Sequence, residues 1–216
     1  FIKVTVGSKK GFVNGKGEEV IPVKYDYVNR YPDDKVFSVC IDGKWGYVNE
    51  KNEVTVPLKY EEIKEFAGGL AEARLNGKWG FVDVKGTEIT PFKYDETVHF
   101  DDGAAMVRIG NNWGFINKKG EETVPLKYDA ANFFIKDLAT VRKENKWGAV
   151  NKEGKEVIPF KYEHINDFYY GYSIVSIGGK WGSIDTKGKV LADIKYDNWF
   201  DFDAGLAAVR ENNKWG

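Results

Sequence analysis

The sequence predicts an all-β protein built from tandem repeats of 34 residues, and three observations predict it. First, a Trp-Gly pair recurs at constant spacing, at Trp45, Trp79, Trp113, Trp147, Trp181 and Trp215. Second, a tyrosine follows 15 residues after each of the first five of these tryptophans, within a Lys-Tyr-Asp/Glu triplet. Third, Val, Ile, Thr, Tyr, Phe and Trp fill the stretches between turns, and these residue types favour strands over helices.

Composition excludes several classes of function. Lys+Arg number 32 against 33 Asp+Glu, and without a basic excess we expect no nucleic-acid partner. No run of 18 apolar residues occurs, so we expect no membrane span. The single Cys40 excludes an internal disulfide. His99 and His164 fall at different positions of the repeat, so we expect no metal site and no catalytic residues. No Gly-rich loop follows a strand and opens a helix, so we also expect no cofactor, and the protein is predicted not to be an enzyme.

Turn residues divide each repeat into strands. The Trp-Gly strand ends at Asn or Asp, and a glycine follows three residues later, as in Asn151 and Gly154. This spacing predicts a type I turn with a left-handed last residue, which joins two strands of a hairpin. The second strand carries a proline such as Pro159, where it must end, bend or lie at an edge. A third strand, Leu206–Arg210 in the last copy, precedes the next Trp strand across a short turn, so each unit is predicted to be three-stranded.

One such unit cannot enclose a core, so neighbouring units are predicted to stack, with the Trp and Tyr columns at the seam. The glycine after each tryptophan is predicted to admit a neighbouring backbone or ring. Because side chains alternate along a strand, the position after the buried Val column is expected to face water, which makes Cys40 a partly exposed, neutral thiol. The same alternation places the lysine and the acid of each Lys-Tyr-Asp/Glu triplet on one face of a strand, so that Lys59 can pair with Glu61 and Lys127 with Asp129. We expect these charges to form a ladder of ion pairs between units, and the alternative is a charged row that binds a ligand.

The Lys-Trp-Gly motif, the Asx–Gly turn, Val-Ile-Pro and Lys-Tyr-Asp together resemble the WG repeat, also called the KWG repeat, of bacterial proteins. The resemblance covers residues 1–216 as a single tandem domain of about six units, with a degenerate first copy at Lys10–Gly11. It implies a β-rich module of bacterial origin, in proteins that are exported or attached to other domains. It carries no catalytic residues to transfer.

Two architectures fit these repeats. The ends of the chain duplicate one another, since Val4 aligns with Val209 and Gly11 with Gly216, whereas a closed ring needs complementary ends. A repeat of 34 residues is also short for a propeller blade. We therefore predict an open, solenoid-like β-array, with a closed β-propeller as the alternative. The chain stops directly after a Trp-Gly pair, as a piece of a longer repeat protein would.

The predicted function is a non-catalytic scaffold that binds a protein or glycan partner. Recognition usually lies in the loops of a rigid scaffold, and aromatic residues that break the repeat pattern are the candidate ligand contacts. The alternative interpretation of these residues is local packing of a variable loop. The candidates are Tyr27, Phe133, Tyr169, Tyr170, Trp199 and Phe200. The alternative function is a structural spacer or filament protein that self-associates through its end strands.

Overall fold

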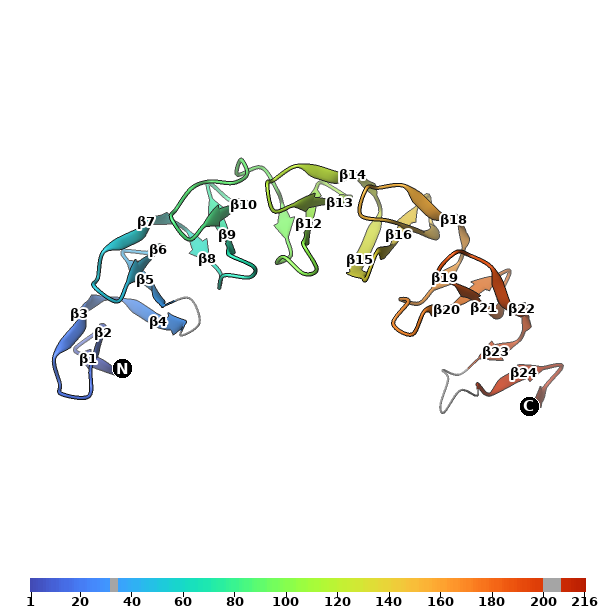
Figure 1. The fold of residues 1–216 in the computed structure, drawn as a ribbon, viewed down its shortest axis with the longest axis horizontal. Helices are drawn as coiled ribbons and strands as arrows, with labels where there is room; N and C mark the ends of the chain where they lie inside the picture. Colours follow the sequence, from blue (N-terminus) through green and yellow to red (C-terminus); the bar gives the residue numbers. More distant parts are fainter. Residues whose placement is uncertain (32–34, 200–206) are drawn as a thin grey trace. The chain divides into compact units, whose positions relative to one another are not determined.

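The computed structural model describes residues 1–31, 35–199 and 207–216, and within them it contains 25 strands and no helix. The strands form seven small antiparallel sheets that follow one another along the chain (Figure 1). The all-β prediction is confirmed. The chain divides into two compact units, one of residues 1–100 with 118–120 and the other of residues 101–117 with 121–216.

The first unit contains three sheets, here called sheets 1 to 3. Sheet 1 consists of β1 (Ile2–Val6), β2 (Lys9–Val13) and β3 (Glu19–Tyr25). Sheet 2 consists of β4 (Tyr27–Tyr31), β5 (Val36–Ile41), β6 (Lys44–Asn49) and β7 (Val54–Tyr60). Sheet 3 consists of β8 (Glu62–Ile63), β9 (Leu70–Leu75) and β10 (Lys78–Asp83). The short β11 (Glu96–Thr97) also falls in this unit.

The second unit continues the pattern through sheets 4 to 7. Sheet 4 includes β12 (Ala104–Ile109), β13 (Asn112–Asn117) and β14 (Glu122–Tyr128). Sheet 5 consists of β15 (Ala130–Ile135), β16 (Leu138–Lys143), β17 (Lys146–Val150) and β18 (Glu156–Tyr162). Sheet 6 consists of β19 (His164–Ile165), β20 (Tyr172–Ile177), β21 (Lys180–Asp185) and β22 (Val190–Tyr196). Sheet 7 consists of β23 (Asn198–Trp199), β24 (Val209–Glu211) and β25 (Lys214–Trp215).

Within each sheet, consecutive strands pair in order, and the central hairpin is the one that the sequence predicts. In sheet 2, β5 pairs with β6 so that Cys40 lies opposite Trp45. Their connecting turn, Asp42–Gly43, has positive φ at both residues, which matches the twist of a two-residue hairpin. The sheets are open, and none closes into a barrel in the described part of the chain.

The unit has more strands than predicted. Sheets 2, 5 and 6 have four strands rather than three, because the residues just after the Lys-Tyr-Asp/Glu triplet form an additional outer strand, such as β4, β15 or β19. The chain leaves one sheet at Tyr25 and enters the next at Tyr27. This strand escaped prediction because it is as short as two residues in β19 and varies in sequence, so no alternation marks it.

The second strand of the repeat bends over the glycine, as predicted, at the position that proline holds in sheets 1, 2, 4 and 5 and Asp193 holds in sheet 6. In sheet 2, Trp45 pairs with Tyr60 and Tyr47 with Val56, so the β7 strand bulges between these pairs. A Cβ atom on Gly46 would lie 2.5 Å from the carbonyl oxygen of Val56, closer than real Cβ atoms approach. At the equivalent position of sheet 5, both the backbone and a phenylalanine ring cover Gly148.

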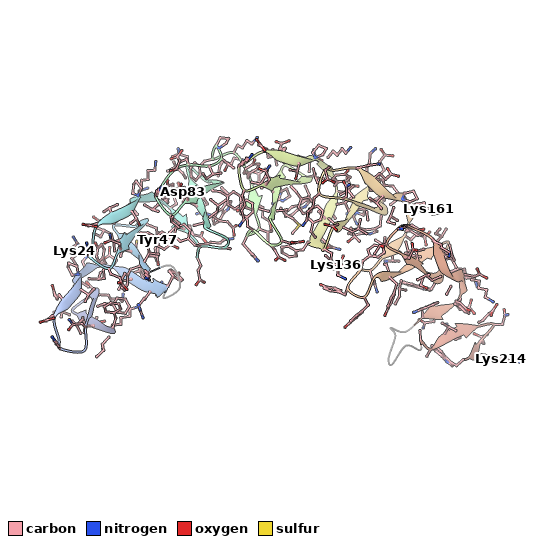
Figure 2. The ribbon with its side chains drawn as sticks, viewed as in Figure 1. Lys24, Tyr47, Asp83, Lys136, Lys161 and Lys214 are labelled. Carbon is pink, nitrogen blue, oxygen red and sulfur yellow. The ribbon has the colours of Figure 1, made fainter. Side chains whose placement is uncertain are left out.

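The core lies between successive sheets, so the central strands are buried on both faces. In sheet 2, Phe37 and Val48 pack in a cluster with Phe12 of sheet 1. The alternate residue Tyr47 packs with Ile63 of sheet 3, and its hydroxyl donates to the carbonyl oxygen of Lys64 at 2.7 Å. Figure 2 labels Tyr47 among the packed side chains. Each sheet therefore depends on its neighbours.

The tryptophans lie at this seam, as predicted. Trp45 packs against the cluster that contains Ile63 and Ala73 of the next sheet. In the second unit, Trp147 of sheet 5 packs against the cluster that contains Ile165 and Val175 of sheet 6. Both indoles are half-buried, and the neighbouring sheet covers part of each ring.

The prediction for Cys40 is wrong. Its side chain is buried, with 2% of its surface exposed, and burial raises the pKa of the thiol. The Tyr27 ring reaches across from the outer strand and stacks on Trp45, with ring centroids 5.6 Å apart. Because Cys40 lies between these two residues in the sheet, the stacked rings cover it.

The predicted ion pairs within the triplets also differ from the structure. Lys59 pairs with Glu88 at 2.7 Å rather than with Glu61, and the Lys127 ammonium lies over the ring of Tyr128. The bend between two sheets separates each triplet's acid from its lysine, because the acid stands where the chain passes from one sheet to the next.

The recurring acid instead joins adjacent sheets. Asp26 accepts from the Lys9 ammonium of sheet 1 at 2.6 Å and from the Asp42 backbone N–H of the sheet 2 hairpin at 2.8 Å. These contacts lower the pKa of Asp26, with the lysine as the main cause. Glu163 accepts similarly from the Gly179 N–H at 3.0 Å, which lowers its pKa.

Candidate functional site

The turn between β19 and β20 places two tyrosines in solvent. The N–H of Gly171 donates to the carbonyl oxygen of Phe168 at 3.1 Å, so Tyr169 and Tyr170 occupy the two middle positions of a β-turn. Phe168 is buried in the core and anchors the turn. The side chains of Tyr169 and Tyr170 are 63% and 84% exposed. The residue equivalent to Tyr170 in the repeat of sheet 5 is Lys136, which is labelled in Figure 2.

These tyrosines border a groove of about 540 Å³ at sheets 5 and 6. The ring of Tyr170 lies nearly parallel to that of Tyr172, with centroids 6.3 Å apart and an angle of 25° between the planes. The repeats before it have buried Leu70, Ala104 and Leu138 at the position of Tyr172. The larger tyrosine is half-buried, and its ring extends the aromatic wall of the groove. The groove is lined by Asn132, Ile165, Asn166, Asp167, Tyr169, Tyr170, Tyr172, Ser173 and Ile174.

A hydrogen-bonded network forms the polar wall of the groove. The buried hydroxyl of Thr140 donates to Oδ1 of Asp167 at 2.7 Å, and the Asn132 amide donates to Thr140 at 2.9 Å and to the same Asp167 oxygen at 3.4 Å. Asn132 and Thr140 belong to sheet 5, whereas Asp167 follows the first strand of sheet 6. The carboxylate is therefore held in place by the preceding repeat.

The chemistry of the groove favours binding. Asp167 is the charged residue among the nine that line it. The hydroxyl of Ser173 donates to the carbonyl oxygen of Asn166 at 2.5 Å, and the lining includes neither a histidine nor a lysine that would activate this serine. The wall thus offers aromatic faces and hydrogen-bonding groups in fixed positions.

A second feature covers the tryptophan rings from within their own sheets. The Arg108 guanidinium lies over Trp113 and that of Arg142 lies over Trp147, 5.5 and 5.8 Å from the ring centroids. Sheet 6 has a small residue in place of this arginine, and there His164 stacks on Trp181 at 5.5 Å. A hollow of about 350 Å³ is lined by Arg108, Asn111, Trp113, Asp129 and Arg142.

A model of the WG containing repeat matches six consecutive segments, residues 11–45, 45–79, 79–113, 113–147, 147–181 and 181–215. The chain belongs to the WG repeat family. The six WG repeats run in register through both compact units. They confirm the family that the sequence predicts and its period of 34 residues.

Solved structures similar to this WG repeat chain have little sequence in common with it. Kluyveromyces lactis Hsv2 is 11% identical with a TM-score of 0.42, over 73% of this chain and 59% of its own. A eukaryotic initiation factor is 9% identical with a TM-score of 0.45, over 96% of this chain and 77% of its own. The chain spans about three fifths of the length of the Hsv2 structures. No curated protein matches the sequence.

The WG repeats place the predicted ligand residues in different surroundings. Tyr169 and Tyr170 meet at the groove, whereas Phe133 of β15 is half-buried and is not among the lining residues. Tyr27 is 56% exposed and stacks on Trp45. Trp199 of β23 packs edge-on against Tyr196. Phe200 lies outside the described residues.

Sequence reasoning missed the polar residues of the groove and Tyr172. Part of their signal was present, because Tyr172 and Ser173 stand where the preceding repeats have smaller or apolar residues. Asp167 falls in a variable column with Glu65, His99 and Phe133, so its role could not be seen there. Among the described residues, no group of three His, Cys, Asp or Glu side chains is placed to hold a metal ion. No helix in that part of the chain has the length and apolar character needed to cross a membrane.

Proposed function

We propose that this WG repeat chain is a non-catalytic scaffold that binds a macromolecular partner at the groove of Tyr169 and Tyr170. The single observation that carries the proposal is the exposure of these two side chains, 63% and 84%, at a turn where the preceding repeats have Ala67-Gly68, Asp101-Asp102 and Ile135-Lys136. Exposed aromatic residues beside a groove commonly anchor a ligand, because they bury a large area with little loss of side-chain entropy.

The surroundings of the tyrosines support binding rather than packing. The phenylalanine that begins the turn, Phe168, already fills the core beneath it, so the two tyrosines contribute little to the burial of the sheet. The polar wall at Asp167 is fixed through Thr140 before any partner arrives. A site that is ordered in advance loses less entropy on binding.

A binding screen against bacterial envelope glycans and envelope proteins tests the proposal, using the whole chain and the double variant Tyr169→Ala/Tyr170→Ala. We expect a saturable partner whose affinity falls about tenfold or more in the double variant. The control is Leu191→Ala, which removes an exposed apolar side chain, 56% exposed, from another strand of the same sheet. Loss of binding in both variants, or in neither, contradicts the proposal.

Self-assembly is the competing function. Sedimentation of the chain over a range of concentrations separates the two, because a partner-binding scaffold stays monomeric without its partner. Association that grows with concentration and that persists in the double tyrosine variant favours a spacer or filament protein.

A further inference from the structure

We infer that the groove of sheets 5 and 6 recognises a neutral glycan chain. The inference rests on the proposed function and names the chemical class of the partner. Its first support is the aromatic wall. The rings of Tyr170 and Tyr172 stack 25° from parallel, and Tyr170 is 84% exposed, so the pair presents an apolar ring face to solvent beside phenolic hydroxyls. A sugar ring has a matching shape, with an apolar face of C–H groups and a rim of hydroxyls, so it can stack on such a surface while its rim stays hydrogen-bonded.

The polar wall provides the complementary hydrogen bonds. Thr140 and Asn132 both donate to Oδ1 of Asp167, which leaves Oδ2 to accept from a ligand. The Asn132 amide nitrogen faces this network, so its carbonyl oxygen is a further acceptor, and Asn166 adds an exposed amide. Oδ2 of Asp167 and the Asn132 oxygen each offer a sugar hydroxyl one acceptor, whereas the Asn166 amide offers a donor and an acceptor in one plane and can bond two adjacent hydroxyl groups. The arrangement therefore suits the rim of a sugar.

Charge and strand length argue against other polymers. Asp167 gives the groove a negative charge, and none of the nine lining residues is Lys, Arg or His, so a nucleic acid or an acidic glycan would be repelled. A peptide added to the sheet edge would pair with β19, which has two residues, His164 and Ile165. So short an edge offers few backbone partners for an added strand. The volume of about 540 Å³ falls within the usual range of a ligand site.

The test is a titration of the whole chain with neutral oligosaccharides, namely glucan, mannan and chitin oligomers, observed by calorimetry. A sulfated oligosaccharide and a neutral peptide library are measured beside them. We expect at least one neutral oligosaccharide to bind and Tyr170→Ala to weaken it about tenfold or more. Tyr170→Phe, which keeps the ring, should retain most of the affinity. Asp167→Asn should weaken binding about fivefold, because it exchanges a charged acceptor for a neutral one.

The outcomes separate this inference from the proposed function. If peptides bind at the tyrosines and no neutral oligosaccharide does, the glycan inference fails while the proposed function stands. If neither class binds, both fail. Oligosaccharide binding that is equal in the parent chain and in Tyr170→Ala overturns the assignment to this groove. Thermal unfolding of each variant is recorded first. Should Tyr170→Ala unfold, Asp167→Asn keeps the inference open to refutation, because an unchanged oligosaccharide affinity in that variant would contradict it.

Discussion

Two loops of this protein occupy the same place in the WG repeat and differ in the side chains that they expose to solvent. The loop of residues 64–69 joins β8 to β9 in sheet 3, and the loop of residues 166–171 joins β19 to β20 in sheet 6. Both begin with the same backbone bond, from Lys64 N–H to the Glu72 carbonyl at 2.8 Å and from Asn166 N–H to the Ile174 carbonyl at 3.0 Å.

They diverge at their tips. The sheet 3 loop ends with two positive-φ residues, Gly68 and Gly69, whereas in sheet 6 Gly171 alone has positive φ. A tyrosine strongly disfavours positive φ. The turn in the sheet 6 loop therefore lies one residue earlier than in sheet 3, between Phe168 and Gly171, and Tyr169 and Tyr170 occupy its two middle positions. The comparison teaches that the repeat positions build the sheets, while the loop tip can change without altering them. We expect substitutions at shared positions to affect stability, and those at the tip to affect binding.

The largest effect is expected at the glycine that follows each tryptophan, a position shared by all sheets. In Gly148→Ala, the new Cβ would lie 2.6 Å from the Ile158 carbonyl oxygen, and backbone cannot move aside easily. We expect the free energy of unfolding to fall by about 3 kcal/mol or more in urea titrations. The control is Gly15→Ala, where a Cβ meets no atom within 4 Å. An equal, small effect at both sites would contradict this role.

The glycine of the Asx–Gly turn tests the seam between sheets. Gly17 and Gly154 both have positive φ, so alanine at either costs about 1 kcal/mol in backbone strain. A Cβ at Gly154 would also lie 2.8 Å from the Thr123 carbonyl of sheet 4, whereas at Gly17 it meets nothing within 4 Å. Urea unfolding should show a larger loss for Gly154→Ala, by about 1–2 kcal/mol. Equal losses of stability in the two variants would mean that sheets 4 and 5 are not in close contact at Gly154.

The buried tyrosine column sharpens the comparison further, because its members differ in one hydrogen bond. The hydroxyl of Tyr25 donates to Oδ1 of Asn52 at 2.7 Å, but that of Tyr60 has no hydrogen-bond partner in the described chain. The residue equivalent to Asn52 in the next repeat is Gly86, which explains the difference. We expect Tyr25→Phe to cost about 1 kcal/mol and Tyr60→Phe to be neutral or slightly stabilising in thermal unfolding. The reverse order would refute this assignment.

The smallest effect concerns pH. Because contacts with Lys9 and the Asp42 N–H lower the folded-state pKa of Asp26 below its usual 3.8, its contribution is present above that pH and is lost as pH falls through the folded-state value. Asp26→Asn should therefore be less stable than the parent at neutral pH, and the gap should close below about pH 4. Acid titrations of stability measure this, with the exposed Glu50→Gln as control. A gap that stays constant with pH would exclude the ionic contribution.

Much of the scaffold was predictable because it depends on residues that recur in register. The period, the hairpin turns and the close approach over Gly46 follow from residue types with strong backbone or packing preferences. The outer strand was not predictable, since short variable segments lack a pattern. The burial of Cys40 escaped too, because it depends on Tyr27 reaching across the sheet. At the groove, the exposed tyrosines were predictable as breaks in the repeat, whereas the link from Thr140 to Asp167 needs the stacking of two sheets.

The most direct measurement gives the sheet 6 loop the tip of the sheet 3 loop, as Tyr169→Ala/Tyr170→Gly, and records unfolding and ligand titration on the same sample. The account predicts a free energy of unfolding within about 0.5 kcal/mol of the parent, and binding that is lost. Binding that survives the exchange would contradict the role of the tyrosines. A collapse of stability would show that the tip belongs to the scaffold after all.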